Sequence, residues 1–373
     1  MATALSLTDE PQAIRNFSGL DWALLLSALL LTGIGVVTVA SATAEMPINF
    51  LPRQALWVGI GLVLMVVIAA VNYRTLVDLA LPAYLGGLGL LVFVLIAGQV
   101  GGGARSWIGV GSLGGQPGEV AKLTTALLLA RYLSSVNKRH LEIKHIAIAV
   151  GIVLVPMVLL ALQPDLGSAA MFVPMLAGML LVAGLRLRFL VIATLVVAAA
   201  GAGLWTFGMQ DYQRERVYTF INPAADPLGA GYQVQQSKIA VGSGQLTGKG
   251  YRQGTQSQLR FLPARHTDFI FAVLAEEWGF LGVMLVLGLY AVFLINALRV
   301  ALRARERAAV LLVVGTVSLV AFHVLYNTGM VVGFLPITGI PIPFLSYGGS
   351  FMLLNFMITG LVLGIDVRRY ANA

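Results

Sequence analysis

The sequence contains no cysteine and few charged residues, and both absences restrict what the protein is. Without cysteine, no disulfide can brace an external loop and no thiolate can serve as a nucleophile or metal ligand. Charged residues make up only 11% of the 373 residues, whereas a soluble protein carries roughly a quarter. Hydrophobic residues make up 58%. This composition predicts an all-α polytopic membrane protein.

The net charge of +8 does not indicate a nucleic-acid-binding protein. Such a protein concentrates its lysines and arginines in one basic patch. Here the basic residues cluster in short loops between apolar spans, as the positive-inside rule predicts for a membrane protein. We therefore expect membrane lipid, and no nucleic acid, as the surroundings of the chain.

The first nineteen residues differ from a secretory signal. They carry Asp9 and Glu10 with one basic residue, Arg15, and lack both the basic start and the small-residue cleavage site of such a signal. We expect residues 1–19 to form a cytoplasmic N-terminal segment, followed by an uncleaved membrane helix.

The apolar runs predict ten spans within one domain, residues 1–373, because a membrane-spanning helix needs about 20 mainly apolar residues. The expected spans are Leu20–Ala42, Gln54–Val71, Val77–Gln99, Pro117–Leu133, His145–Leu162, Gly167–Leu185, Phe189–Met209, Asp268–Leu302, Ala308–Gly333 and Tyr347–Val367. The fourth is the least apolar, and the eighth is long enough to tilt or protrude.

The basic residues predict that both termini are cytoplasmic. With that orientation the short outside loops hold only Arg53 and Arg105. The inside set is Arg15, Arg74, Arg131, Lys138, Arg139, Lys144, Arg186, Arg188, Arg299, Arg303, Arg305, Arg307, Arg368 and Arg369.

The same orientation makes residues 210–267, between the seventh and eighth spans, a large extracytoplasmic loop. Its Asn-Pro, Asp-Pro and Gly-rich signals predict turns and short segments rather than a separate domain. The run Gly244–Gly250 contains Lys249 but ends in glycine and follows no buried strand, so it is not a P-loop. A long loop of this kind is uncommon unless it is functional.

Three carboxylates, those of Asp268, Glu276 and Glu277, lie where this loop enters the eighth span. An ionisable group at membrane depth is a candidate functional residue because charge there is costly. Asp268 could instead cap the helix. Glu276 and Glu277 lie about 12–14 Å deeper along the helix and need partners, which Lys122 or a basic loop residue could supply.

Two further polar segments flank apolar spans. In Gln116–Lys122, Pro117 suits the first helical position, Glu119 suits the first turn, and Lys122 lies on the same helix face as Glu119. This pattern fits either a capped helix with an internal ion pair or a lysine that lines a cavity open to the outside. In Gln163–Ser168, Asp165 follows a proline, a pattern that predicts a turn or a helix cap at Asp165.

The segment Leu335–Ser350 is dense in proline and glycine. Irregular backbone at membrane depth is tolerated only where protein or a water-filled cavity surrounds it. This segment therefore predicts a re-entrant or kinked cavity wall, in which Ser346, Tyr347 and Gly348 take part. A transporter gate would show the same pattern.

Taken together, these segments resemble the SEDS family of bacteria, the proteins of shape, elongation, division and sporulation. The resemblance covers nearly the whole chain, and its motifs occur in the family's order. They are Ser106–Ile108 with Gln116–Glu119, then Gln163–Gly167, Gln236-Ser237 with Gly248-Lys249-Gly250, His266–Ala272 and Leu345–Ser350. Residues 329–343 resemble the elongation members more than the division members. Gly118 and Ala264 depart from the family's usual Ser and Glu.

The resemblance implies a peptidoglycan glycosyltransferase of the cytoplasmic (inner) membrane that polymerises lipid II on its outer face during cell elongation. It implies Asp268 as the catalytic carboxylate, since a base must take the proton of the attacking sugar hydroxyl. The implied substrate-binding residues are Trp107, Glu119, Lys122, Ser237, Lys249 and Arg252, with the cations facing the departing pyrophosphate. The implied structural or cavity-lining residues are Gln116, Pro117, Asp165, Glu276, Glu277, Ser346, Tyr347 and Gly348.

The resemblance also implies partners: a class B penicillin-binding protein, whose transpeptidase would cross-link the new strand, and the elongation machinery. The resemblance leaves open whether a divalent cation, Mg²⁺ or Mn²⁺, is a cofactor.

The alternative function is a flippase for lipid II or another lipid-linked sugar. Broken helices and cavity carboxylates fit both functions. A flippase needs charged groups near the midplane, whereas here they gather at the outside ends of the spans, which favours the enzyme. A non-catalytic scaffold would leave Lys122, Glu276 and Glu277 unexplained.

Overall fold

The computed structural model describes residues 20–368 except 49, 102–103, 111–112, 137, 139, 187 and 190–228. Its helices are α1 Trp22–Ala42, α2 Leu51–Ala70, α3 Tyr73–Asp78, α4 Ala80–Ala97, α5 Pro117–Ser135, α6 Ile143–Leu162, α7 Leu166–Ala170, α8 Phe172–Ala183, α11 Ala230–Ser243, α12 Thr255–Gln258, α13 Ile270–Arg303, α14 Arg307–Val331 and α15 Gly349–Arg368. Its strands are β1 Gln99–Gly101, β2 Ala104–Val110 and β3 Leu113–Gly115.

Every expected span other than the seventh coincides with helix. Among the described residues, eight helical segments are long and apolar enough to cross a membrane, and α5 is not one of them, in line with its weak hydrophobicity. The third expected span began too early, because α3 is a separate short helix that ends before Leu79. The seventh span, residues 1–19 and residues 210–228 lie outside the described residues, so the count of ten stays a prediction.

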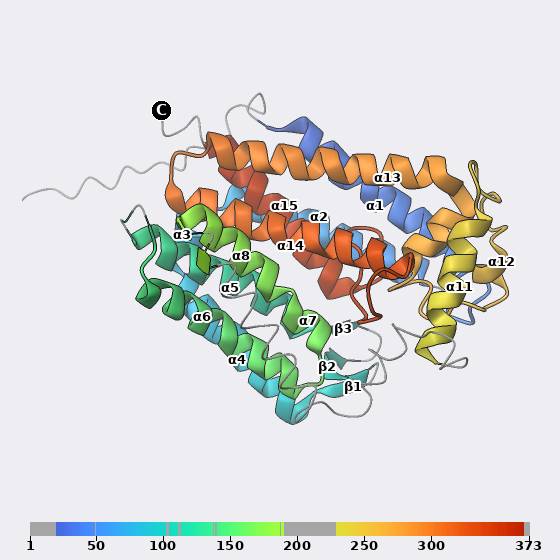
Figure 1. Cartoon of the computed structure of the whole chain (residues 1–373), viewed down its shortest axis with the longest axis horizontal. Coiled ribbons are helices and arrows are strands. Elements are labelled where there is room, and N and C mark those ends of the chain that lie inside the picture. Colours follow the sequence, from blue (N-terminus) through green and yellow to red (C-terminus); the bar gives the residue numbers. More distant parts are fainter. Residues whose placement is uncertain are drawn as a thin grey trace, which may run out of the picture.

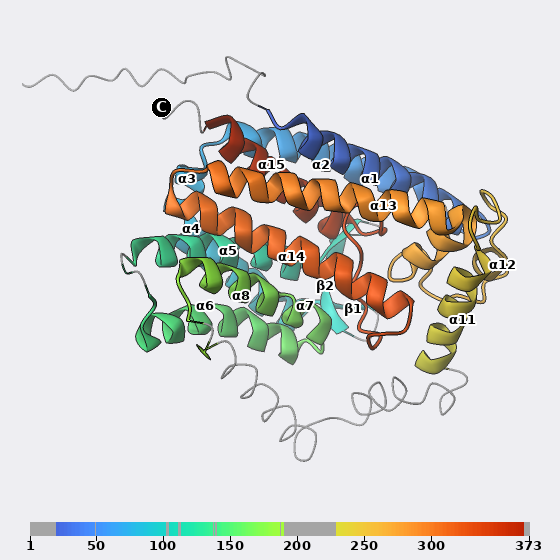
Figure 2. The ribbon, with the colours of Figure 1, turned by 45° about the horizontal axis from the view of Figure 1, so that its top comes forward.

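The long helices form a bundle with α15 near its centre (Figures 1 and 2). The most apolar window of α15 is 78% buried inside the protein, against 17% for α2. The exposed side chains of α2 are apolar, among them Val63 and Val66. Since exposed apolar side chains on a long helix face lipid rather than water, α15 forms the core of the bundle and α2 borders the membrane.

The two ends of the bundle differ in structure. At one end lie α11, α12 and the three strands, and at the other lie α3 and the turn between α13 and α14 (Figures 1 and 2). The strands form a small antiparallel sheet in the order β1-β2-β3, with Gln99 opposite Trp107 and Ile108 opposite Gly115. The sequence analysis did not predict this sheet, because glycines interrupt any alternation of apolar and polar residues there.

The described part of the long loop is more ordered than the sequence predicted. Instead of turns and short segments alone, it contains the 14-residue helix α11, which packs against α13 and α14. Val234, Ser237 and Ala240 on α11 are buried. Their spacing of three residues places them on one helix face, so contact with the bundle stabilises a helix whose polar composition did not indicate it.

Residues 332–348, between α14 and α15, form irregular backbone, of which residues 342–346 lie in the interior. Ile342, Phe344 and Leu345 are completely buried, and the hydroxyl of Tyr290 on α13 donates to the Pro343 carbonyl oxygen. On α1, a Cβ atom at Gly35 would overlap the Phe344 carbonyl oxygen, so only glycine permits this close approach. The predicted irregular backbone is therefore confirmed, and protein surrounds residues 342–346; the predicted role of the segment as a cavity wall stays a prediction.

Candidate functional site

Asp268 lies in a tight turn immediately before α13. The backbone N–H groups of Thr267, Asp268 and Phe269 all donate to the Ala264 carbonyl oxygen at 3.1–3.3 Å. The N-cap of α13 is Phe269, which has no side-chain capping bond. The first non-helical position of α13 is thus Phe269, one residue after Asp268. Its half-buried side chain lies beside Gly339, where an added Cβ would be 3.6 Å from Oδ2.

The segment before α15 fixes this turn. Ser346 Oγ donates to the Thr267 carbonyl oxygen at 2.7 Å, and the Tyr347 N–H donates to the His266 carbonyl oxygen at 2.9 Å. Ser346 Oγ also accepts from the Ile342 N–H. The predicted structural residues Ser346 and Tyr347 thus join the irregular wall to the turn that contains Asp268. Gly348 follows them directly and precedes α15.

Asn327 on α14 completes the support of the turn. Its Nδ2 donates to the carbonyl oxygens of Asp268 and Ile340, each at 2.8 Å, and the residue is fully buried. Asn327 is not among the site residues that the sequence predicted. The signal available was a polar amide within an otherwise apolar span, which must find hydrogen-bond partners inside the bundle.

An aromatic cluster covers the other side of the turn. The His266 ring lies 4.8 Å from the ring of Phe50 and 5.8 Å from that of Tyr347, measured between centroids. Burial, with a smaller effect of the neighbouring Arg265 charge, lowers the pKa of His266 below its ordinary value. His266 is therefore neutral at pH 7, and Asp268 has an uncharged ring two residues before it.

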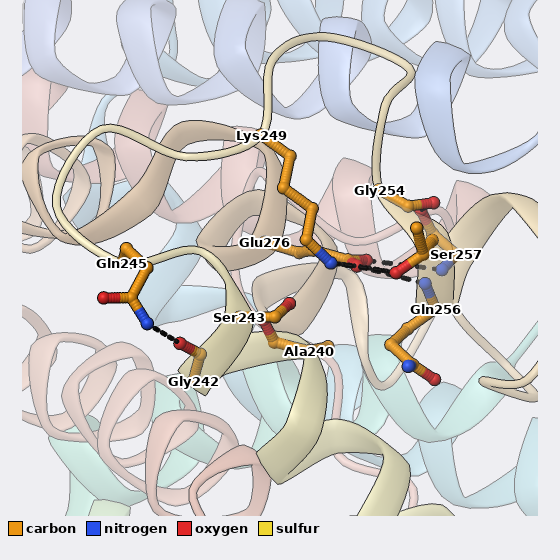
Figure 3. A network of polar contacts seen from close by, with 10 residues as sticks. Ala240, Gly242, Ser243, Gln245, Lys249, Gly254, Gln256, Ser257 and Glu276 are labelled. Carbon is orange, nitrogen blue, oxygen red and sulfur yellow. Dashed lines mark hydrogen bonds and ion pairs between the residues drawn. The ribbon is translucent and has the colours of Figure 1, made fainter.

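Glu276 binds the long loop to α13. Its Oε1 accepts from Lys249 Nζ at 2.7 Å, from Thr255 Oγ1 at 3.1 Å and from the Gln256 N–H at 3.0 Å (Figure 3). The carboxylate is fully buried, while the Lys249 side chain is 27% exposed. The partner that the sequence required for Glu276 is thus a basic loop residue rather than Lys122. This ion pair already satisfies Lys249, whose contact with pyrophosphate stays a prediction.

A break in α13 lets the loop run along it. Gly279 has a φ of 65° and a ψ of −164°, a conformation open only to glycine, and its Cα faces the backbone of Gly248. There the N–H groups of Phe280 and Leu281 donate to the carbonyl oxygens of Gln245 and Leu246 at 2.9 and 3.0 Å. The expected eighth span is therefore interrupted one turn after Glu276, and its freed backbone donors bind the loop.

Glu277 contacts α1, another neighbour of α13. Its carboxylate accepts a hydrogen bond from the Ser41 hydroxyl on α1. The residue also borders an open groove of about 500 Å³ lined by Val37, Thr247, Tyr251, Glu277, Trp278, Leu281, Gly282 and Leu285. Asp268 is not among these lining residues. Glu277 is therefore a contact between helices at the edge of a mainly apolar groove.

The start of α5 has the predicted local structure. Pro117 occupies the first turn, and Lys122 Nζ lies 2.7 Å from Glu119 Oε1 in an ion pair that is almost completely buried. Lys122 also lies 6.0 Å from the centre of the Phe351 ring on α15. Both interpretations of the segment share this ion pair, and the burial of Lys122 shows that water does not reach its ammonium group in this conformation.

Gln116 connects the start of α5 to two other motifs. Its N–H donates to Ser350 Oγ at 3.0 Å, and its Nε2 donates to Asp165 Oδ2 at 2.6 Å. Asp165 is the N-cap of α7, accepting from the Ser168 N–H at 3.0 Å. The structural interpretation of Asp165 is thus confirmed. Ser350 lies three residues after Tyr347 in the chain, so one segment, residues 346–350, contacts both Gln116 and the Asp268 turn.

Three predicted substrate-binding residues lie apart from these contacts. Ser237 is fully buried on α11 and donates to the Val331 carbonyl oxygen at 2.8 Å, an interaction that fixes α11 on α14. Trp107 is half-buried on β2. Arg252 is exposed, with its guanidinium 5.4 Å from the Tyr251 ring centre. Because Ser237 is buried, a structural role explains it more simply than contact with substrate. Arg252, being exposed, is accessible to a ligand.

Metal ligands are sparse around these residues. Within the described parts of the chain, no three His, Asp or Glu side chains come close enough to form a metal site. Mg²⁺ commonly binds through one or two carboxylates plus substrate phosphates and water, so the open question of a divalent cation stays a prediction about the substrate-bound state.

Comparison with known proteins identifies the family. The model of the cell cycle protein family, whose name joins FtsW, RodA and SpoVE, matches residues 21–371. The chain belongs to this family, and the SEDS resemblance is confirmed. It is a multi-pass membrane protein.

Individual relatives show which members it is most similar to. The peptidoglycan glycosyltransferase MrdB of Escherichia coli K12 is 39% identical over 94% of both chains. The peptidoglycan glycosyltransferase RodA of Treponema pallidum is 34% identical, over 95% of this chain and 99% of the relative. Stage V sporulation protein E of Bacillus subtilis is 39% identical, over 94% and 98%. The predicted likeness to RodA-type members is confirmed.

Two solved structures share the fold. A chain from a study of how a peptidoglycan synthase complex coordinates polymerization and crosslinking matches with a TM-score of 0.82 and 34% identity, over 94% of this chain and 98% of that chain. The crystal structure of the rod shape determining protein RodA of Thermus thermophilus matches with a TM-score of 0.71 and 30% identity, over 95% and 99%.

Proposed function

We propose that this protein is a peptidoglycan glycosyltransferase that polymerises lipid II on the outer face of the cytoplasmic membrane during cell elongation. The observation that carries the proposal is the set of contacts around the Asp268 turn. Asn327 on α14, and Ser346 and Tyr347 from the segment before α15, bind the backbone of residues 266–268 through hydrogen bonds. A catalytic carboxylate requires such support of its backbone by distant segments.

In the proposed reaction, a sugar hydroxyl of one substrate attacks the anomeric carbon of a second sugar. A C–O bond forms there as the bond to undecaprenyl pyrophosphate breaks, and the hydroxyl proton passes to a base. Asp268 is the proposed base. The anomeric centre passes through an oxocarbenium-like state, which a nearby carboxylate also stabilises.

The pyrophosphate leaving group needs positive charge. Arg252 is the best placed of the candidates because its guanidinium is exposed next to the loop that Glu276 binds to α13. Lys122 and Lys249 each pair with a carboxylate in this conformation, so either would have to exchange that carboxylate for the phosphate. Before that exchange, Glu119 positions Lys122.

The protein is proposed to work with a class B penicillin-binding protein. The similar chain of known structure comes from a complex that both polymerises and crosslinks, and a transpeptidase would supply the crosslinking activity here. The outer face and both cytoplasmic termini are proposed from the positive-inside rule.

The experiment supplies labelled lipid II to the purified protein with its penicillin-binding partner and measures glycan strand length on a gel. We expect long strands from the wild type and none from Asp268→Asn. The matched control is Asp78→Asn, the same change at an exposed residue at the other end of the bundle, which should polymerise normally.

Two results would change the proposal. Strands of normal length from a folded Asp268→Asn variant would remove Asp268 from catalysis. No strands from the wild type, despite intact folding and partner binding, would favour the flippase, which a lipid II translocation assay in vesicles would then test.

A further inference from the structure

A second pocket lies at the end of the bundle remote from Asp268. It has a volume of about 200 Å³ and is lined by Tyr73, Arg74, Ala304, Arg305, Glu306, Ala309, Ile365 and Arg368. These residues come from α3, from the turn between α13 and α14, from the first turn of α14, and from the end of α15. Asp268 precedes α13 and the pocket follows it, so the 34 residues of that helix, or about 50 Å, separate the two places.

The lining of this pocket is strongly basic. Arg74, Arg305 and Arg368 contribute three positive charges and Glu306 one negative charge, which leaves an excess of two positive charges. Arg74 forms an ion pair with Glu306. Among the lining side chains, one carboxylate therefore faces three guanidinium groups, an imbalance of charge that favours an anion.

Several donors in the pocket are already fixed in place. The guanidinium of Arg368 donates to the carbonyl oxygens of Ala69 at 2.7 Å and Gly364 at 3.0 Å. Burial and the adjacent Glu306 raise the pKa of Tyr73, so its hydroxyl keeps its proton. Glu306 is the N-cap of α14 and makes no side-chain capping bond, so the positive end of that helix also faces this region.

The surroundings of the pocket point to a lipid rather than a soluble anion. Leu302 lies two residues before Ala304 of the pocket lining and is 86% exposed. An exposed leucine at this place fits contact with acyl chains. By the positive-inside rule this end of the bundle is cytoplasmic, where anionic lipids attract basic residues. We propose that this pocket binds the phosphate of an anionic phospholipid headgroup from the cytoplasmic leaflet. Arg74, Arg305 and Arg368 are its ligands.

The test follows thermal unfolding of the purified full-length protein in neutral detergent by tryptophan fluorescence. Dioleoylphosphatidylglycerol, dioleoylphosphatidylcholine and inorganic phosphate are added separately. We expect only phosphatidylglycerol to raise the unfolding temperature, and to do so saturably. Because each basic residue near an anionic lipid contributes about fivefold to affinity, Arg74→Gln with Arg305→Gln should require about 30-fold more lipid for half of the shift.

The control is Arg186→Gln with Arg188→Gln, which removes the same charge from exposed positions outside the pocket and should titrate like the wild type. If the first double variant does not fold, Arg305→Gln alone, at an exposed position, should still bind about fivefold more weakly.

Equal titrations of pocket and control variants, or an equal shift with phosphatidylcholine, would overturn the proposal. A shift with phosphate alone would make this a site for a soluble anion. Since the readout is binding, the result is independent of glycosyltransferase activity.

Discussion

The amide nitrogen of Asn327 lies 2.8 Å from the carbonyl oxygen of Asp268, although 59 residues separate them in the chain. The same nitrogen bonds Ile340 in the irregular wall. One side chain on α14 therefore sets the position of the proposed catalytic turn relative to the wall beside it.

Replacing Asn327 should reduce activity more than stability. Asn327→Ala removes two hydrogen bonds, each worth about 1 kcal/mol, and releases the Asp268 backbone. Displacement of a catalytic group by about 1 Å can cost about 100-fold in rate, so we expect a loss of that order in lipid II polymerisation.

The matched control for this change is Asn355→Ala. Asn355 is also buried, but its amide nitrogen donates to the Phe351 carbonyl oxygen within the same helix, α15. Polymerisation and thermal unfolding are measured for both variants. Equal losses of activity would mean that any buried asparagine matters as much, and Asn327 would lose its specific role.

A double-mutant cycle separates the two possible roles of Lys249. Breaking a buried ion pair by removing one partner costs about 3–5 kcal/mol. Because Lys249 is partly exposed, we expect about 2 kcal/mol for Glu276→Gln, with faster proteolysis of residues 244–262. If Lys249 acts only through Glu276, adding Lys249→Met should cause no further loss of activity. A further loss would indicate direct contact with substrate.

Much of the fold and part of the site could be predicted because they depend on local sequence. Apolar runs predicted the spans, and the spacing of Glu119 and Lys122 predicted their ion pair. The proline and aspartate of Gln163–Gly167 predicted a capped turn. In each case the residues that interact lie within a few positions of one another.

The rest depends on contacts between distant segments. Nothing near Asn327 in the chain shows that it bonds Asp268, and the composition of α11 does not show which face the bundle buries. The break in α13 was also missed, because a single glycine in an apolar helix is usually accommodated. Only the approach of Gly248 requires the conformation that Gly279 adopts.

Acidification should destabilise the aromatic cluster around His266. Burial lowers the pKa of His266 below the ordinary value of 6.5, so the unfolded chain takes up a proton before the folded protein does. The resulting stability is present above pH 6.5 and is lost as the pH falls through the lower folded pKa. We expect the unfolding temperature to fall between pH 7 and about 5, and His266→Gln to reduce that dependence.

His140→Gln serves as the control, because His140 is exposed in a loop. This variant should keep the pH dependence of the wild type. A His266→Gln variant whose unfolding temperature still falls with pH as steeply as that of the wild type would assign the effect to other groups.

Gly279→Ala should disrupt the contact between α13 and the loop. Gly279 has a positive φ and an extended ψ that a residue with a Cβ adopts only at a cost of about 1–3 kcal/mol, and the added Cβ would overlap the nitrogen of Gly248.

Gly288→Ala is the matched control in the same helix, since nothing lies within 4 Å of its Cβ position. Alanine should stabilise that position by up to about 1 kcal/mol. Thermal unfolding of both variants, with limited proteolysis of the loop, measures the difference. If Gly279→Ala is as stable as Gly288→Ala and its loop as resistant to protease, the break in α13 is not required for the loop to bind.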